Sequence, residues 1–171
     1  RQTPDGKDLT INLAAMSKDK TQEAVIQNYI QQWKSIGLNV KLTTGRLIEF
    51  NSFYDKVQND DPSVDMFLAA WSLSSEPSPN DLYNPKAPYN FSRFNQPEQT
   101  KLLEDIDSQQ AFDAKYRQNA FKKWQAWMDD QAYVVPVSNS YTVYSVNDKV
   151  TGYKLTPSVT GMVDWFEVGL S

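Results

Sequence analysis

Two pairs of adjacent carboxylates are the first candidates for chemistry in this chain of 171 residues. Asp60 precedes Asp61, and Asp129 precedes Asp130. A glycosidase needs two carboxyl groups that converge on one bond, whereas neighbours in the sequence point in different directions on a helix or a strand. We therefore interpret both pairs as solvated acids at helix ends and in loops, where most Asp residues lie. A carbohydrate-active enzyme is the less favoured alternative.

The composition excludes several other kinds of site. The chain has no Cys and no His, which excludes thiol nucleophiles, Ser-His-Asp triads and ordinary zinc centres. We expect no metal and no cofactor. The net charge is -4 and there is no basic tract, so nucleic acid is not an expected partner. No apolar run reaches the ~20 residues that a membrane span needs.

A third candidate is an aromatic residue at the end of an apolar run. The run extends from Val64 to Trp71 and is followed by a polar, proline-rich loop. Continuous apolarity predicts a strand that is buried on both faces, as in a parallel sheet. Ligands of open α/β sheets bind outside the carboxyl ends of the strands. Phe50, at the start of a predicted helix, is expected at the same edge. The two rings could line a ligand cleft, or Trp71 could cap the core beneath the loop.

The elements that must position these rings are predicted by hydrophobic periodicity. Apolar residues alternate along residues 9–15 and 38–43, which is typical of strands. Residues 21–36 carry apolar residues at helical spacing. The side chains of this helix expected to pack on the sheet are Ile26, Ile30 and Trp33. With a second helix over residues 50–57 and the strand at 64–71, the order is βαβαβ, which indicates an α/β fold.

The ends of the first helix can also be predicted. Ser17 and Thr21 are both possible N-caps, and Gly37 is placed where a glycine ends a helix. The chain begins RQTPDGK, without Met and without a signal peptide. We therefore expect a mature or excised piece of a longer protein.

The second half of the chain is predicted to begin with a long loop. Residues 72–96 contain four prolines, and loops of this length in compact domains are usually functional. Helices are predicted from Pro97, with Leu102, Leu103 and Ile106 inside, and over residues 112–128. Strands are expected at 132–137 and 141–146, and a short extended piece at 152–155. We expect residues 1–171 to form a single α/β domain.

An ordered set of motifs extends over nearly the whole chain. They are IGLNV at 36–40, DMFLAAWSLSSEPSP at 65–79, NFSRFN at 90–95, YRQNAFKKWQ at 116–125 and AYVVPV at 132–137. The set resembles the peptide-binding proteins of ABC importers, extracellular solute-binding protein family 5, and most of all their Gram-positive oligopeptide-binding branch. The resemblance implies a periplasmic-binding-protein-like (type II) fold, in which a mixed sheet with flanking helices forms the C-terminal lobe of a longer, three-domain chain.

The resemblance also implies a ligand and a site. Trp71 would reach the cleft between two lobes, and Ser72, Leu73 and Ser74 would line it with backbone groups for an extended oligopeptide; Phe50 would lie nearby. Backbone bonding suits a receptor for many peptides, because every peptide offers the same N–H and C=O pattern. Dipeptide- and tripeptide-type members hold the ligand's α-ammonium with an Asp shortly after the Trp. Ser74 takes that place here and lacks the charge of a carboxylate.

The expected partners follow from the same resemblance. They are the oligopeptide, the N-terminal lobe of the same protein and the ABC permease subunits. The full-length protein is expected to be extracellular and lipid-anchored at the cell surface, without catalysis and without a cofactor. Because a fold can serve several ligands, a receptor for an oligosaccharide or a signalling peptide is an alternative.

Overall fold

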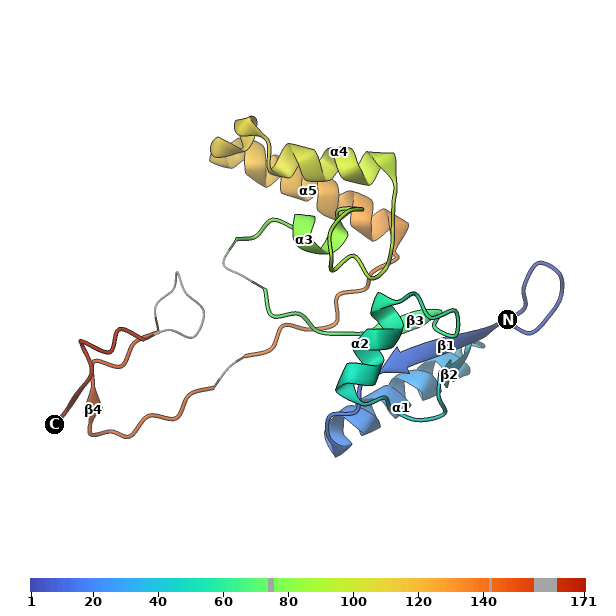
Figure 1. Cartoon of the computed structure of the whole chain (residues 1–171), viewed down its shortest axis with the longest axis horizontal. Helices are drawn as coiled ribbons and strands as arrows, with labels where there is room; N and C mark the ends of the chain where they lie inside the picture. The colour runs from blue at the N-terminus through green and yellow to red at the C-terminus, as the bar shows by residue number, and fades with distance from the viewer. Residues whose placement is uncertain (74–75, 142, 156–162) are drawn as a thin grey trace. The chain divides into compact units, whose positions relative to one another are not determined.

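The computed structural model describes residues 1–73, 76–141, 143–155 and 163–171 (Figure 1). The chain divides into two compact units, Arg1–Trp71 and Ser72–Ser171. That residues 1–171 form a single domain stays a prediction.

A three-stranded parallel sheet is the centre of the first unit. Its strands are β1 (Thr10–Ala15), β2 (Asn39–Leu42) and β3 (Met66–Leu68), in the order β2-β1-β3. Leu13 of β1 is paired with Leu42 on one side and with Met66 on the other. Because β1 is the central strand, its last three residues are buried. The predicted parallel βαβαβ order is confirmed.

Helix α1 (Lys20–Ser35) supplies much of the core beside this sheet. Ile26 is fully buried and clusters with Leu13, Ala15 and Val40, while Ile30 and Trp33 pack against the cluster. The predicted contact of Trp33 with the core is therefore confirmed. Gly37 has φ +82°, a left-handed conformation that glycine adopts at low cost, and it follows the helix as predicted.

The predicted N-caps of α1 are wrong. The cap is Asp19, whose carboxylate accepts a hydrogen bond from the Gln22 backbone N–H at 2.8 Å. Ser17 lies too early, and its backbone N–H donates to the Ile48 carbonyl. Thr21 is already inside the helix. Asp19 has the extended backbone that a cap needs, directly before the first turn.

Helix α2 (Phe50–Gln58) agrees with its prediction, whereas strand β3 is shorter than predicted. Phe53 and Val57 are buried on the inner face of α2. The predicted strand at 64–71 is reduced to Met66–Leu68, whose residues are half-buried. At its beginning, the Asp65 carboxylate accepts bonds from both the backbone N–H and the side-chain amide of Asn12. The backbone N–H of Asn12 in β1 thus donates to a side chain, whereas a longer β3 would offer it a backbone carbonyl.

The second unit is built on two helices, α4 (Pro97–Ile106) and α5 (Ala114–Gln131), which pack side by side (Figure 1). Leu103 and Ile106, both predicted to face inward, are fully buried. Helix α5 begins later than predicted because Asp113 is its N-cap and accepts from the Tyr116 N–H at 2.7 Å. Phe112 belongs instead to the 3-10 helix η1 (Gln109–Phe112) and is 94% exposed, so its predicted place in the helical stripe is wrong.

Aromatic rings pack around the carboxyl-terminal half of α5. The rings of Phe94 and Tyr133 are stacked with their centres 3.4 Å apart, and the ring of Trp127 meets both edge-on. Burial raises the pKa of the Tyr133 hydroxyl. Trp124 packs on Tyr83, the last residue of helix α3 (Asn80–Tyr83). This cluster joins the short helix of the loop region to α5.

The predicted strands at 132–137 and 141–146 are not formed by the described residues of these segments. Most of their large apolar side chains are exposed, including Val135, Val137, Tyr141 and Val143. Alternation shows that a segment can be a strand, but a strand also needs a neighbour with which to pair. Further on, β4 (Val150–Thr151) pairs antiparallel with β5 (Gly169–Leu170), and Leu155, in the predicted extended piece, forms a bridge with Val163. No helix in the described ranges has the length and apolarity to cross a bilayer.

Candidate functional site

Trp71 lies just beyond the carboxyl end of the sheet. Strand β3 ends at Leu68, which is paired with Ala15, the last residue of the central strand. Three residues later, the Trp71 side chain is 37% exposed. The indole after the third strand is therefore partly exposed. An indole in this position offers a large apolar surface at the edge where α/β sheets bind ligands.

Phe50 lies at the same edge of the sheet. The Ile48 N–H donates to the Ala15 carbonyl at 2.9 Å, and Ile48 forms a parallel bridge with Met16. This pairing fixes the start of α2 beside the carboxyl end of β1. Phe50 is the first residue of α2 and is 59% exposed, with its ring edge-on to Tyr54 at 4.9 Å. The structure thus brings two of the predicted site residues to one edge of the first unit.

The remaining predicted site residues belong to the second unit. Ser72 and Leu73 are exposed, Leu73 at 63%. Ser74 lies outside the described residues. That the backbone groups of Ser72 and Leu73 face a ligand stays a prediction.

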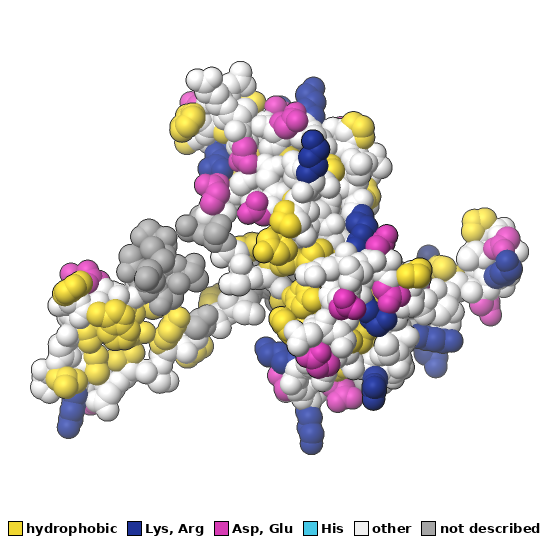
Figure 2. Space-filling view, in the orientation of Figure 1, with side chains coloured by type: hydrophobic (Ala, Val, Ile, Leu, Met, Phe, Trp, Pro, Cys, Tyr) yellow, Lys and Arg dark blue, Asp and Glu magenta, His cyan; other side chains and the backbone are white. Residues whose placement is uncertain are grey.

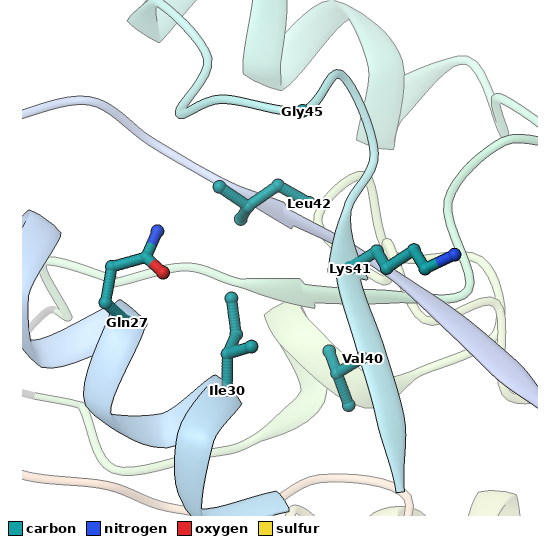
Figure 3. Close-up of a pocket in the computed structure, with 6 residues that line it drawn as sticks. All are labelled: Gln27, Ile30, Val40, Lys41, Leu42 and Gly45. Atoms are coloured by element: carbon teal, nitrogen blue, oxygen red, sulfur yellow. The ribbon is translucent and has the colours of Figure 1, made fainter. Parts of the chain in front are cut away.

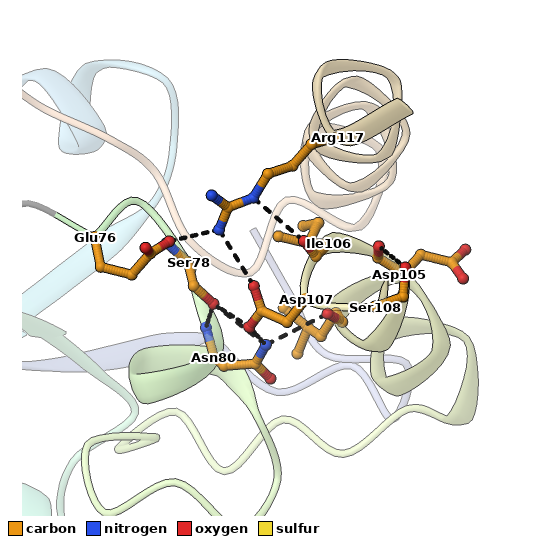
Figure 4. Close-up of polar contacts among 9 residues, drawn as sticks. Glu76, Ser78, Asn80, Asp105, Ile106, Asp107, Ser108 and Arg117 are labelled. Carbon is orange, nitrogen blue, oxygen red and sulfur yellow. Dashed lines mark hydrogen bonds and ion pairs between the residues drawn. The ribbon is translucent and has the colours of Figure 1, made fainter. Parts of the chain in front are cut away.

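A polar network in the second unit holds the chain that follows these residues (Figure 4). Arg117 Nη2 on α5 forms an ion pair with Glu76 Oε1 at 2.5 Å and a longer one with Asp107 Oδ1 at 3.4 Å. The other oxygen of Asp107 accepts from the Ser78 hydroxyl and from the Asn80 amide, both at 2.5 Å. We call Glu76, Ser78, Asn80, Asp107 and Arg117 the Arg117 network.

Sequence reasoning missed the Arg117 network. Glu76 and Arg117 are 41 positions apart, so no local spacing relates them. The hydrogen bond that Arg117 donates to the Glu76 carboxylate is the main reason that the pKa of Arg117 is raised. Like other arginines in proteins, Arg117 is charged at every ordinary pH.

Of the four residues in the two carboxylate pairs, Asp61 is held by hydrogen bonds and the other three are exposed. Asp61 accepts from Lys56 Nζ at 2.5 Å and from both the hydroxyl and the backbone N–H of Ser63. These bonds, chiefly that from Lys56, hold the pKa of Asp61 far below its ordinary value. Asp60, Asp129 and Asp130 are exposed. Among the described residues, no group of three or more His, Cys, Asp or Glu is placed to hold a metal.

The first unit has a pocket on the side of the sheet where β2 lies. It is formed by α1, β2 and the turn after β2 (Figure 3). Its lining residues are Gln27, Ile30, Val40, Lys41, Leu42 and Gly45. Strands β2 and β3 flank β1 on opposite sides, and Trp71 follows β3. The predicted site residues that the structure describes, Phe50, Trp71, Ser72 and Leu73, do not line this pocket.

Known proteins resemble this chain over nearly its whole length. No family model matches it. The oligopeptide-binding protein OppA of Lactococcus lactis subsp. lactis (strain IL1403) is 47% identical over 169 residues, which are 98% of this chain and 28% of that protein. An OppA sequence of Lactococcus lactis subsp. cremoris is 45% identical over 107 residues, which are 63% of this chain and 85% of that sequence. The chain belongs to the OppA family of solute-binding proteins.

Solved structures agree with this membership. Lactococcal OppA, complexed with an endogenous peptide in the closed conformation, matches at a TM-score of 0.79 with 42% identity, over 97% of this chain and 31% of that one. AppA of Bacillus subtilis, in complex with a nonapeptide, matches at a TM-score of 0.66 with 21% identity, over 98% and 32%. The predicted fold class is confirmed. The chain spans 28% of the length of the lactococcal OppA protein of strain IL1403.

Proposed function

We propose that residues 1–171 form the C-terminal lobe of a longer OppA-family receptor that captures extracellular oligopeptides for an ABC importer. The observation that carries this proposal is the kinship over 98% of the chain with a protein named for oligopeptide binding. The peptide bound to lactococcal OppA supports the same ligand class. The role is binding without turnover, because the relatives are substrate-binding proteins.

The proposed peptide contacts are Trp71, Phe50, Ser72, Leu73 and Ser74. The exposed rings of Trp71 and Phe50 at the carboxyl edge of the sheet support this choice. Aromatic rings give a large contact area with few rotatable bonds, so they suit a site that accepts varied side chains. Backbone groups of Ser72 and Leu73 would bind the peptide main chain, which is the same in every peptide.

The proposed partners are the N-terminal lobe of the same protein and the permease subunits of the importer. The full-length receptor would act outside the cell, held at the surface by a lipid anchor. A cleft between two lobes removes a peptide from water on both sides. The isolated residues 1–171 should therefore bind peptide much more weakly than the full-length receptor.

The test is a titration of the full-length receptor with a pool of random synthetic nonapeptides. We expect saturable binding, and mass spectrometry should recover every bound peptide intact. Oligosaccharides of similar mass serve as the control ligand and should not bind. Cleavage of the peptides, or saturable binding of the oligosaccharides alone, would contradict the proposal.

A further inference from the structure

The Arg117 network fastens one end of the loop that begins at Ser72. Its three loop members alternate along the chain, and Figure 4 shows their side chains directed toward the carboxyl end of α4 and toward Arg117. The Glu76 carboxylate also accepts the Ser78 backbone N–H at 3.2 Å. Asn80 adds a bond to the Leu103 carbonyl at 3.3 Å. Residues 76–80 are thus held by side-chain bonds to two helices.

Arg117 is itself held in one orientation. Its Nε donates to the Ile106 carbonyl at 3.3 Å, and its guanidinium lies 5.6 Å from the centre of the Phe121 ring. The side chain is 29% exposed. A planar guanidinium can donate to several acceptors at once, which an ammonium group at the same place cannot do with the same geometry. The loop is therefore attached to a fixed point of α5.

The attachment limits where the proposed peptide contacts can lie. Leu73 and Glu76 are three residues apart, so their Cα atoms cannot be more than about 11 Å apart even in a fully extended chain. Because Glu76 is fixed on α5, Leu73 can lie only within this distance of the attachment point. Groups that are restricted before the ligand arrives lose less conformational entropy when they bind it.

We propose that Arg117 is a positioning residue for ligand binding: through Glu76 and Asp107 it holds residues 76–80 on α4 and α5 and thereby presets the backbone of Ser72 and Leu73 for the peptide. This inference rests on the proposed function. Arg117 is not assigned any contact with the peptide. A plain surface ion pair would affect only the stability of the unit, and by little; a positioning residue must also change affinity and the order of the loop.

The experiment compares the full-length wild type with Arg117→Met, Arg117→Lys and a control, Lys123→Met, which removes a positive charge from an exposed residue of the same helix. Three quantities are measured for each protein. They are the Kd for the random nonapeptide pool, the amide exchange rate of residues 72–80 without peptide, and the midpoint of urea unfolding. Together they separate a change in the loop from a change in the whole protein.

Arg117→Met should raise Kd about fivefold, the scale of ordering one or two more side chains. It should also speed amide exchange of residues 72–80 by about tenfold, because exchange follows local opening. Arg117→Lys should lie between wild type and Arg117→Met, since its ammonium can pair with Glu76 but cannot reproduce the guanidinium fork. Lys123→Met should match wild type in all three measurements.

The outcomes separate this inference from the proposed function. A wild type that binds no peptide would overturn the proposed function, and this inference with it. A wild type that binds, with Kd and exchange of residues 72–80 unchanged in Arg117→Met, would overturn this inference alone. If Arg117→Met does not fold, Glu76→Gln decides by the same criteria, because it removes the charge of a loop residue whose side chain is 60% exposed.

Discussion

The beginning and the end of the chain differ in what becomes of their apolar side chains. In the first unit, Ile26 and Phe53 are completely buried against neighbouring elements. In the segment after α5, the side chains of Tyr141, Phe166 and Leu170 are each more than four-fifths exposed. Figure 2 shows hydrophobic side chains gathered on the surface around β4. The same residue types therefore form a core in one region and a surface in the other.

The difference teaches that a periodic pattern of apolar residues predicts burial only where the helix or strand that packs against it lies nearby in the sequence. In the first unit each strand is followed by a helix or paired with a strand within about fifty residues, so its apolar face is covered locally. The segment after α5 has only the short β4–β5 pair among its described residues. Large exposed apolar surfaces usually mark an interaction site. That the N-terminal lobe covers the apolar surface after α5 stays a prediction.

The largest expected effect tests this contrast directly. Phe53→Ala should lower the free energy of unfolding by about 3–5 kcal/mol, because it leaves a cavity at a fully buried position. Phe166→Ala is the matched control and should change it by less than about 0.5 kcal/mol, since that ring is fully exposed. Urea unfolding of chain 1–171, followed by circular dichroism, measures both. Equal losses in the two variants would mean that the end of the chain has a core of its own.

The next effect concerns exposed aromatic rings in binding. In the full-length receptor, Trp71→Ala should weaken peptide binding by about 2 kcal/mol, the scale of an aromatic hot spot. Phe112→Ala removes a ring that is 94% exposed but outside the proposed site, and it should leave affinity unchanged. Calorimetric titration with the nonapeptide pool measures both. An unchanged affinity in Trp71→Ala, with the fold intact, would remove Trp71 from the site.

A smaller effect is expected for recognition of the peptide's N-terminus. With Ser74 in place, free and N-acetylated forms of a peptide should bind equally, because a hydroxyl supplies no charge for the α-ammonium. Ser74→Asp should favour the free form by about 1.5 kcal/mol, the lower range for a hydrogen bond between charged groups. Ser74→Asn is the neutral control. A wild-type preference for free N-termini would show that another group binds the ammonium.

The smallest expected effect is the pH dependence of the first unit. The Lys56 ammonium, with Ser63, lowers the pKa of Asp61 below its ordinary value of 3.8. A carboxylate with a lowered pKa in the folded state stabilises the fold above the unfolded-state pKa, and this contribution is lost as pH falls through the folded-state pKa. The midpoint temperature of thermal unfolding of the wild type should therefore decrease as the pH falls below about 4, and Lys56→Met should reduce that dependence. An identical pH profile in the two proteins would contradict this.

The secondary structure of the first unit could be predicted well, because each of its elements is specified by residues close together in the sequence. Alternation at residues 9–15 and the helical stripe of Ile26, Ile30 and Trp33 depend on neighbours within one element. Gly37 follows from the backbone conformation that ends a helix. For the site, an apolar run that ends on Trp71 placed the indole at the sheet edge, but it left open whether the ring lines a cleft or caps the core. The family could also be predicted, from motifs spread along the chain.

Long-range contacts decided the rest. The sequence by itself determined the βαβαβ order, the helices that cover the sheet and the place of Trp71 after the third strand. Only the tertiary structure decided that β3 begins no earlier than Met66, since Asp65 binds Asn12 from 53 positions away, and that Glu76 is held by Arg117 on α5. The physical reason is that periodicity describes what one segment can bury, whereas strand length, loop anchoring and the absence of strands at 132–137 depend on which partner surface a distant segment supplies.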